Sequence, residues 1–145
     1  MCLIVDANLV GVVFGQTKPD YAGVYKAIVS GAAKMVYGGK LTNEYRKVVW
    51  FRSILLELDR QGRTRQYPSH IIEARVRALA ARGICRSDDP HVLGLAQVSG
   101  ARILCSEDSR LCSDFLDVRI VSNPQGNVYK RPKHNHLFRK HCRDA

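Results

Sequence analysis

The sequence predicts an α/β protein, a three-layer α/β/α sandwich with a central, mainly parallel sheet. Short apolar runs end abruptly in carboxylates, as in CLIVDAN at 2–8 and ILCSED at 103–108. Such runs are typical of strands buried on both faces of a parallel sheet. Segments whose apolar residues recur at helical spacing lie between these runs. Strands and helices therefore alternate, and helices can connect parallel strands. A chain of 145 residues is long enough for one domain with a proper core.

The first part of the chain predicts two strands and three helices. The first strand is Cys2–Val5, and Asp6 lies at its carboxyl end, where ligands bind in open α/β sheets. The other elements expected here are a helix over Ala7–Phe14 ended by Gly15, a helix over Tyr21–Gly31 capped by Asp20, a strand over Lys34–Tyr37, and a long helix over Leu41–Leu58 capped by Thr42 or Asn43.

Glu44 lies on the apolar stripe of the long predicted helix, one turn from Leu41 and one turn from Val48. Its carboxylate therefore points at the protein and away from bulk solvent. A buried Glu without a partner is costly, so a cation or a set of donors must meet it. Arg52, two turns further on and roughly on the same face, is the candidate structural partner, and a metal ion is the functional one.

The second part predicts a polar connector followed by helices and short strands. Pro90 keeps Asp89 out of the α region, so Asp89 is expected to cap the next helix. The elements expected are a connector over Asp59–Tyr67, a helix from Pro68-Ser69 to about Arg82, a helix from Pro90 to about Ser99 closed by Gly100, a strand over Arg102–Cys105, a short helix over Leu111–Phe115, an edge strand over Val118–Val121, and a hairpin partner over Asn127–Tyr129.

Four acids can meet at one edge of this sheet. Asp6 and Asp108 each follow the carboxyl end of a buried strand, Glu44 points inward, and Asp89 begins a helix. Clustered carboxylates repel one another unless divalent cations neutralise them, and hard oxygen ligands select Mg²⁺ or Mn²⁺ over zinc. Each acid also has a structural interpretation: Asp89 and Asp108 as helix caps, Glu44 as the partner of Arg52, and Asp6 as part of a turn.

The charge balance points to a polyanionic partner. The chain has 23 Lys and Arg against 13 Asp and Glu, a net charge of +10 and a pI near 9.7. The segment after Val121 holds six Lys or Arg and one Asp, which gives +5 in 24 residues. The residues expected to contact an RNA backbone are Arg60, Arg63, Arg65, Lys130, Arg131, Lys133, Arg139 and Lys140. The alternatives are a solvated loop at 60–65, a disordered basic tail over 122–145, and charge that serves solubility alone.

The cysteines give no disulfide framework or zinc knuckle, because they are odd in number and never form a C-x-x-C pair. No apolar run reaches about 18 residues, and nothing resembles a signal peptide, so a cytoplasmic protein without a membrane partner is expected. A zinc site in the tail is a minor alternative. Its ligands would be His134, His136, His141 and Cys142, whose spacing suits a tetrahedral site poorly.

The sequence resembles the PIN-domain family over Cys2 to about Val121. The resemblance rests on LIVDAN, LTNEY, DPHVLGLA with Ala96 seven residues after Asp89, and ILCSED, whose Asp108 follows Ala96 by twelve residues. It implies a PIN-like domain over 1–121, followed by a basic C-terminal hairpin or tail over 122–145. It also implies that Asp6, Glu44, Asp89 and Asp108 form the acidic site, with Asn8 and Ser106 as auxiliary polar residues. Asp88 is the rival of Asp89, and the spacing to Ala96 favours Asp89.

PIN domains are mostly metal-dependent ribonucleases, and many are toxins of toxin–antitoxin pairs. The resemblance therefore implies an endoribonuclease, an antitoxin or other regulatory protein as partner, and a homodimer. In the expected mechanism, two Mg²⁺ or Mn²⁺ ions activate a water for in-line attack and leave a 5′ phosphate. His91 is a candidate catalytic aid. The alternative function is a PIN-like module that binds RNA or a protein without cutting.

Overall fold

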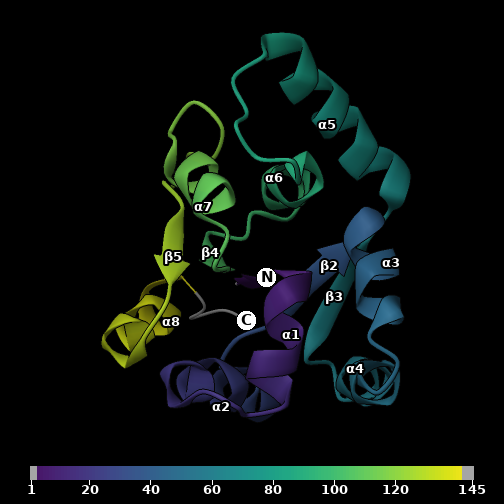
Figure 1. Ribbon diagram of the computed structural model, residues 1–145, viewed down its shortest axis with the longest axis vertical. Helices are drawn as coiled ribbons and strands as arrows, with labels where there is room; N and C mark the ends of the chain where they lie inside the picture. The colour runs from purple at the N-terminus through teal and green to yellow at the C-terminus, as the bar shows by residue number, and fades with distance from the viewer. Residues whose placement is uncertain (1–2, 142–145) are drawn as a thin grey trace.

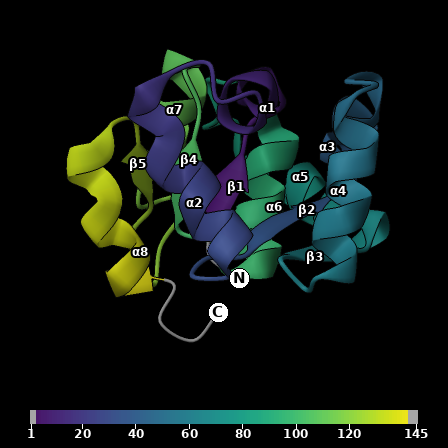
Figure 2. The ribbon, with the colours of Figure 1, turned by 90° about the horizontal axis from the view of Figure 1, so that it is seen from below.

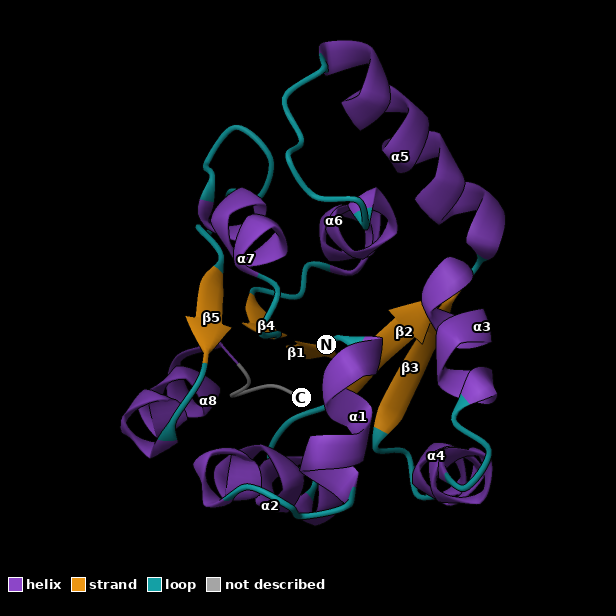
Figure 3. Ribbon diagram, viewed as in Figure 1, coloured by secondary structure: helices purple, strands orange, loops and turns teal. Residues whose placement is uncertain are grey.

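The computed structural model describes residues 3–141, and side chains over 3–139. Its centre is a five-stranded, all-parallel sheet in the order β3-β2-β1-β4-β5 (Figures 1 and 3). The parallel sheet confirms the predicted α/β class. The strands are β1 (Leu3–Val5), β2 (Met35–Gly38), β3 (Thr64–Tyr67), β4 (Ile103–Cys105) and β5 (Asn127–Tyr129).

Helices cover both faces of the sheet. Figures 1 and 2 show α5, α6 and α7 on one side and α1, α2 and α8 on the other, with α3 and α4 beside β2 and β3. The helices are α1 (Ala7–Phe14), α2 (Ala22–Ser30), α3 (Lys40–Lys47), α4 (Phe51–Arg60), α5 (Ser69–Arg82), α6 (Pro90–Ser99), α7 (Ser109–Leu116) and α8 (His136–His141), with 3₁₀ turns η1 (Pro19–Tyr21) and η2 (Pro132–Asn135). This arrangement is compatible with a three-layer sandwich.

The chain reverses its direction of winding at β1. From β1 it moves to β2 and β3 on one side, and it then crosses to β4 and β5 on the other. The pairing Val5↔Cys105 places the carboxyl ends of β1 and β4 side by side. Ligands of open α/β sheets bind outside the strand ends at such a switch point. The topology therefore places Asp6, which follows β1, beside the segment that follows β4.

The three central strands are fully buried, as their apolar runs predict. Every residue of β1, β2 and β4 is buried, including Leu3, Ile4 and Ile103, whose exposed fractions are 0%. Two predicted helix ends are confirmed, because Gly83 and Gly100 adopt left-handed backbone conformations immediately after α5 and α6. Glycine reaches that conformation without the steric cost that a Cβ imposes.

The helix predicted over 41–58 is two helices. The chain leaves the α region at Val48, and α4 starts at Phe51. The break lets Tyr45 and Phe51 both reach the core, where their ring centroids lie 5.6 Å apart. The predicted caps are also wrong, because α3 begins after Gly39 and not at Thr42 or Asn43, and Asp20 lies within η1 and does not cap α2.

The edges of the sheet differ from the prediction. The connector predicted over 59–67 contains strand β3, whose partly exposed side chains give no apolar signal. Backbone hydrogen bonds to β2 are enough to form β3, because an edge strand does not need a buried apolar face. No strand forms over Val118–Val121, which is a turn. Asn127–Tyr129 pairs in parallel with β4, so the predicted hairpin is wrong and the segment after Val121 contributes to the same sheet.

Within residues 3–141, no helix is both long enough and apolar enough to cross a membrane. The predicted first residue of β1, Cys2, lies outside the described residues.

Candidate functional site

Asp6 is fixed at the carboxyl end of β1 by its neighbours on β4. Its amide donates to the Cys105 carbonyl at 2.9 Å, which extends the β1–β4 ladder by one bond. Although Asp6 occupies the N-cap position of α1, its side chain makes no capping bond. Asp6 Oδ2 instead accepts a 2.7 Å bond from the hydroxyl of Ser106, which is fully buried. The Asp6 carboxylate therefore faces the edge of the sheet and not its own helix.

The environment of Asp6 disfavours its charge. Burial raises the pKa of Asp6 above its ordinary value, and the charges of Asp89 and Glu44 raise it further, while the Ser106 hydrogen bond lowers it. Only 6% of Asp6 is exposed. Three acids from separate parts of the chain thus repel one another at this point. A bound cation would relieve this repulsion and lower the pKa.

Glu44 lies on α3 and is paired with His91 of α6. His91 Nε2 lies 2.6 Å from Glu44 Oε1, and the side chains are 8% and 28% exposed. The adjacent Tyr45 donates its hydroxyl proton to the Val5 carbonyl at 2.5 Å, which ties α3 to the end of β1. Burial is the main reason that the pKa of Tyr45 is raised well above its ordinary value, so the phenol stays a donor.

Arg52, the predicted structural partner of Glu44, does not contact it. Arg52 lies on α4, beyond the break at Val48, and its Nε donates to the Arg46 carbonyl at 2.6 Å. The prediction failed because it extended one helix through the break and so gave Arg52 a false position. His91, considered only as a catalytic aid, is the partner. His91 lies two residues after Asp89 in the first turn of α6, and this position is the feature of the sequence that indicates a place beside the acids.

Asp89 is positioned by a loop that has its own hydrogen bonds. The buried Asp114 carboxylate accepts from the amides of Arg86 and Ser87 at 2.9 and 2.8 Å, and the Ser87 hydroxyl accepts from the Asp89 amide at 2.9 Å. Asp89 precedes Pro90 as predicted, but its side chain makes no capping bond. Its carboxylate is therefore not used by the helix.

Ligand atoms of Glu44, Asp89 and His91 all lie within 4.8 Å of one another and could hold a metal ion. The carboxylate oxygens, together with Asp6 nearby, suit Mg²⁺ or Mn²⁺, and the imidazole nitrogen favours Mn²⁺ of the two. His91 Nδ1 is buried and has no hydrogen-bond partner among residues 3–139. The group could therefore hold a metal ion, with a nitrogen ligand that the four-carboxylate prediction did not include.

Asp108 caps a helix, which is the structural role that the sequence offered as an alternative to metal binding. Asp108 Oδ1 accepts from the amides of Arg110 and Leu111 at 3.0 and 3.2 Å, so it caps α7. Its own amide donates to the Ser106 hydroxyl at 3.0 Å. Asp108 is therefore linked to Asp6 through Ser106, but it is not part of the group formed by Glu44, Asp89 and His91. Its second oxygen, Oδ2, takes no part in the cap.

The remaining acidic and auxiliary candidates differ in placement. Ser106 contacts Asp6 directly, whereas Asn8 is exposed on α1. Asp88 is exposed and lies outside the group that could hold a metal, which agrees with the choice of Asp89.

The predicted RNA-contacting residues do not form one surface. Arg63 precedes the first residue of β3, so it lies at the amino edge of the sheet, opposite the acids. Arg60 ends α4 and pairs with Glu57 at 3.9 Å, and the Arg65 guanidinium lies 5.3 Å from the Tyr67 ring centroid. Lys130 and Arg131 follow β5 at the carboxyl edge of the sheet, the edge where the acids lie. Lys133 and Arg139 are exposed, and the side chain of Lys140 lies outside the described residues.

The residues suggested for a tail zinc site are only partly described. His134 Nδ1 accepts from the Lys130 amide at 3.0 Å, and His136 Nδ1 contacts the Lys133 carbonyl at 2.9 Å. The His141 side chain and Cys142 lie outside the described residues.

Comparison with protein-family models, curated proteins and solved structures gives no match. The function of the acidic group, which consists of Asp6, Glu44, Asp89 and the adjoining His91, therefore has to follow from its geometry.

Proposed function

We propose that this protein is a PIN-like endoribonuclease that uses Mg²⁺ or Mn²⁺ to hydrolyse RNA phosphodiester bonds. One observation carries the proposal: Asp6, Glu44, and the pair Asp89 and His91 come from three parts of the chain and lie near one another at the switch point of a parallel sheet. Such an arrangement costs stability through burial and like-charge repulsion, which favours a functional reason for it.

The residues divide into metal holders and positioning residues. Glu44, Asp89 and Asp6 would hold the cation, and His91 would add a nitrogen ligand. The bound cation would supply an activated water and stabilise the leaving oxygen. Ser106 holds the Asp6 carboxylate in place. Asp108 orders the loop after β4, because its Oδ1 caps α7.

Basic residues at the acidic edge would hold the RNA backbone. Lys130 and Arg131 are the best placed of the predicted contacts because they follow β5 on the same edge as Asp108. Arg60 and Arg63, at the other edge, would contact only RNA that wraps around the sheet. Neutralising phosphates releases counterions, so binding should weaken steeply as salt rises. The resemblance also predicts an antitoxin or regulatory protein as partner, and a homodimer. Both remain predictions.

The test is cleavage of 5′-labelled single-stranded RNA with Mg²⁺ or Mn²⁺, with EDTA as the metal-free control. Asp6→Asn, Glu44→Gln and Asp89→Asn should each lower the rate at least about 100-fold. The matched control is Asp88→Asn, which removes an exposed carboxylate one residue from Asp89 and should cut at the wild-type rate. Products should carry 5′ phosphates, and circular dichroism should show that all variants are folded.

The second candidate is a PIN-like RNA-binding or protein-interaction module without activity. The direct Glu44–His91 pair favours it, because His91 can satisfy the Glu44 carboxylate without a metal. RNA binding without cleavage of total cellular RNA, and no effect of Mg²⁺ or Mn²⁺ on thermal stability, would support the module and exclude the nuclease.

A further inference from the structure

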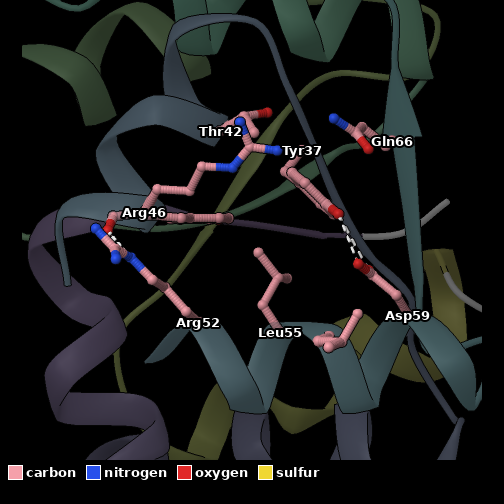
Figure 4. Close-up of a pocket in the computed structure, with 9 residues that line it drawn as sticks. Tyr37, Thr42, Arg46, Arg52, Leu55, Asp59 and Gln66 are labelled. Carbon is pink, nitrogen blue, oxygen red and sulfur yellow. Dashed lines mark hydrogen bonds between the residues drawn. The ribbon is translucent and has the colours of Figure 1, made fainter. Parts of the chain in front are cut away.

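A pocket lies between helices α3 and α4 and strands β2 and β3, away from the acidic group (Figure 4). Its volume is about 440 Å³, which is within the range of small-molecule sites. Its lining residues are Tyr37, Thr42, Tyr45, Arg46, Arg52, Leu55, Leu56, Asp59 and Gln66. The acidic group uses none of these residues as ligands.

One end of the pocket is cationic. The Nε of Arg52 donates to the Arg46 carbonyl at 2.6 Å, so the Arg52 guanidinium lies beside the Arg46 backbone, and the Arg46 guanidinium lies further along the pocket. Figure 4 shows the Arg46 side chain extending along the pocket towards Thr42 and Tyr37. Within residues 3–139, no carboxylate pairs with either guanidinium. The Arg46 guanidinium, which has no acidic partner among these residues, favours an anion with several oxygens, such as a phosphate.

Thr42 gives independent evidence of a ligand. It is 5% exposed, yet its Oγ1 has no hydrogen-bond partner among residues 3–139. Because Thr42 and Arg46 are four residues apart on α3, they face the same region. A buried hydroxyl left unpaired destabilises the folded protein, and a ligand oxygen at this position would relieve that cost.

The other end of the pocket suits a planar ring with an N–H donor. The Tyr37 hydroxyl donates to both Asp59 oxygens at 3.1 and 3.0 Å, and burial together with Asp59 raises the pKa of Tyr37 to about 12. Leu55 and Leu56 give apolar surface, and Leu56 is 51% exposed. Gln66 can donate and accept, and the Asp59 carboxylate, which also accepts from the Thr64 hydroxyl, has no cationic partner among the described residues.

We infer that this pocket binds a nucleoside monophosphate. The phosphate lies on the Arg46 guanidinium and the Thr42 hydroxyl, and the base lies against Tyr37 and Leu55 with its amino group towards Asp59. A phosphate could not lie at the Asp59 end, because the carboxylate would repel it. The site is separate from the acidic group, so binding requires neither a metal ion nor cleavage.

The test is calorimetric titration of the full chain with AMP in EDTA. AMP should bind with a dissociation constant on the order of 100 µM or below. Arg46→Gln should weaken binding about tenfold or more, because it removes charge-assisted bonds to phosphate. Thr42→Val should weaken binding several-fold without lowering the melting temperature of the free protein, since it removes an unpaired hydroxyl and keeps the side-chain shape.

The controls separate this site from general attraction to a basic protein. Arg75→Gln removes an exposed arginine of α5, and Asp6→Asn changes the acidic group, so both should bind AMP within twofold of wild type. Adenosine and inorganic phosphate should each bind at least about tenfold more weakly than AMP. The inference is overturned if AMP does not bind at millimolar concentration, if phosphate alone binds as tightly, or if Arg75→Gln has the same effect as Arg46→Gln.

Discussion

The Ser106 hydroxyl donates a 2.7 Å hydrogen bond to Asp6 Oδ2, across one hundred residues of sequence. The same hydroxyl accepts from the Asp108 amide at 3.0 Å. A fully buried serine thus connects the ends of β1 and β4, the strands on either side of the switch point. The geometry of Asp6 depends on a residue that is not itself a metal ligand.

Ser106→Ala should reduce metal-dependent cleavage about 10- to 100-fold, the usual effect of removing a group that orients a ligand. It should also lower the free energy of unfolding by about 1–3 kcal/mol, because the Asp6 oxygen and the Asp108 amide lose a buried partner. Ser106→Thr keeps the hydroxyl and is the matched variant. Metal titration of activity together with urea unfolding measures both effects, and an active Ser106→Ala protein would contradict the assigned role.

Asp6→Asn should stabilise the metal-free protein at pH 7 while it removes activity. The folded state raises the pKa of Asp6, mainly through burial, so the charged form costs stability above that pKa. The cost disappears as pH falls and the carboxyl binds a proton. A gain of about 0.5–2 kcal/mol is expected at pH 7, with a smaller difference at pH 4. Thermal unfolding in EDTA at both pH values tests this, and a destabilised variant at pH 7 would contradict it.

His91→Asn should weaken Mn²⁺ binding about 10- to 100-fold, because it replaces an imidazole ligand beside Glu44. Mg²⁺ prefers oxygen ligands, so its affinity should change less. Calorimetric titration of the folded protein with each metal measures the two affinities. Unchanged Mn²⁺ affinity would mean that His91 only satisfies the Glu44 carboxylate.

Gly94→Ala should destabilise the protein by about 1–3 kcal/mol, because α5 and α6 are in close contact there. A Cβ at Gly94 would lie 2.9 Å from Val76 Cγ2 and 3.1 Å from the Ile72 carbonyl oxygen. Gly11→Ala is the control, since that glycine is also helical and the nearest atom to its Cβ would be 3.9 Å away. This change should stabilise α1 by about 0.5–1 kcal/mol. Chemical denaturation of both variants tests the contrast in sign.

The segment after β5 should lose stability in mild acid. His134 Nδ1 accepts from the Lys130 amide, so His134 must be neutral there. Burial and the charges of Lys133, Arg131 and His136 lower its pKa from 6.5. The stabilisation is therefore present above pH 6.5 and is lost as pH falls through the folded-state pKa.

The expected loss is about 0.5–1 kcal/mol, the size of one ordinary hydrogen bond. His134→Gln offers an acceptor that does not titrate, so its stability should depend less on pH in this range. Thermal unfolding of both proteins between pH 7.5 and 5 measures the difference. An identical pH dependence in the two proteins would contradict the role of His134.

The strands with strong local signals were predictable, and the edges of the sheet were not. The runs before Asp6 and Ser106 are apolar because both faces of β1 and β4 are covered, and burial leaves this pattern in any sequence. β3 is formed by backbone bonds to β2 and carries partly exposed Thr, Arg, Gln and Tyr. A pattern of apolar residues cannot reveal such a strand, so the sequence predicts a connector there.

The α/β class, the central strands and the closeness of Asp6 to the segment after Ile103–Cys105 are predictable from the sequence, because they follow from local burial patterns and the rules of parallel sheets. The different roles of the acids depend on tertiary contacts. Asp89 is free because Ser87 and Asp114 order its loop, Asp108 is engaged as a cap, and Glu44 meets His91 and not Arg52. Those outcomes depend on where helices break and on which surfaces pack together, and such contacts join residues too far apart for local spacing to specify.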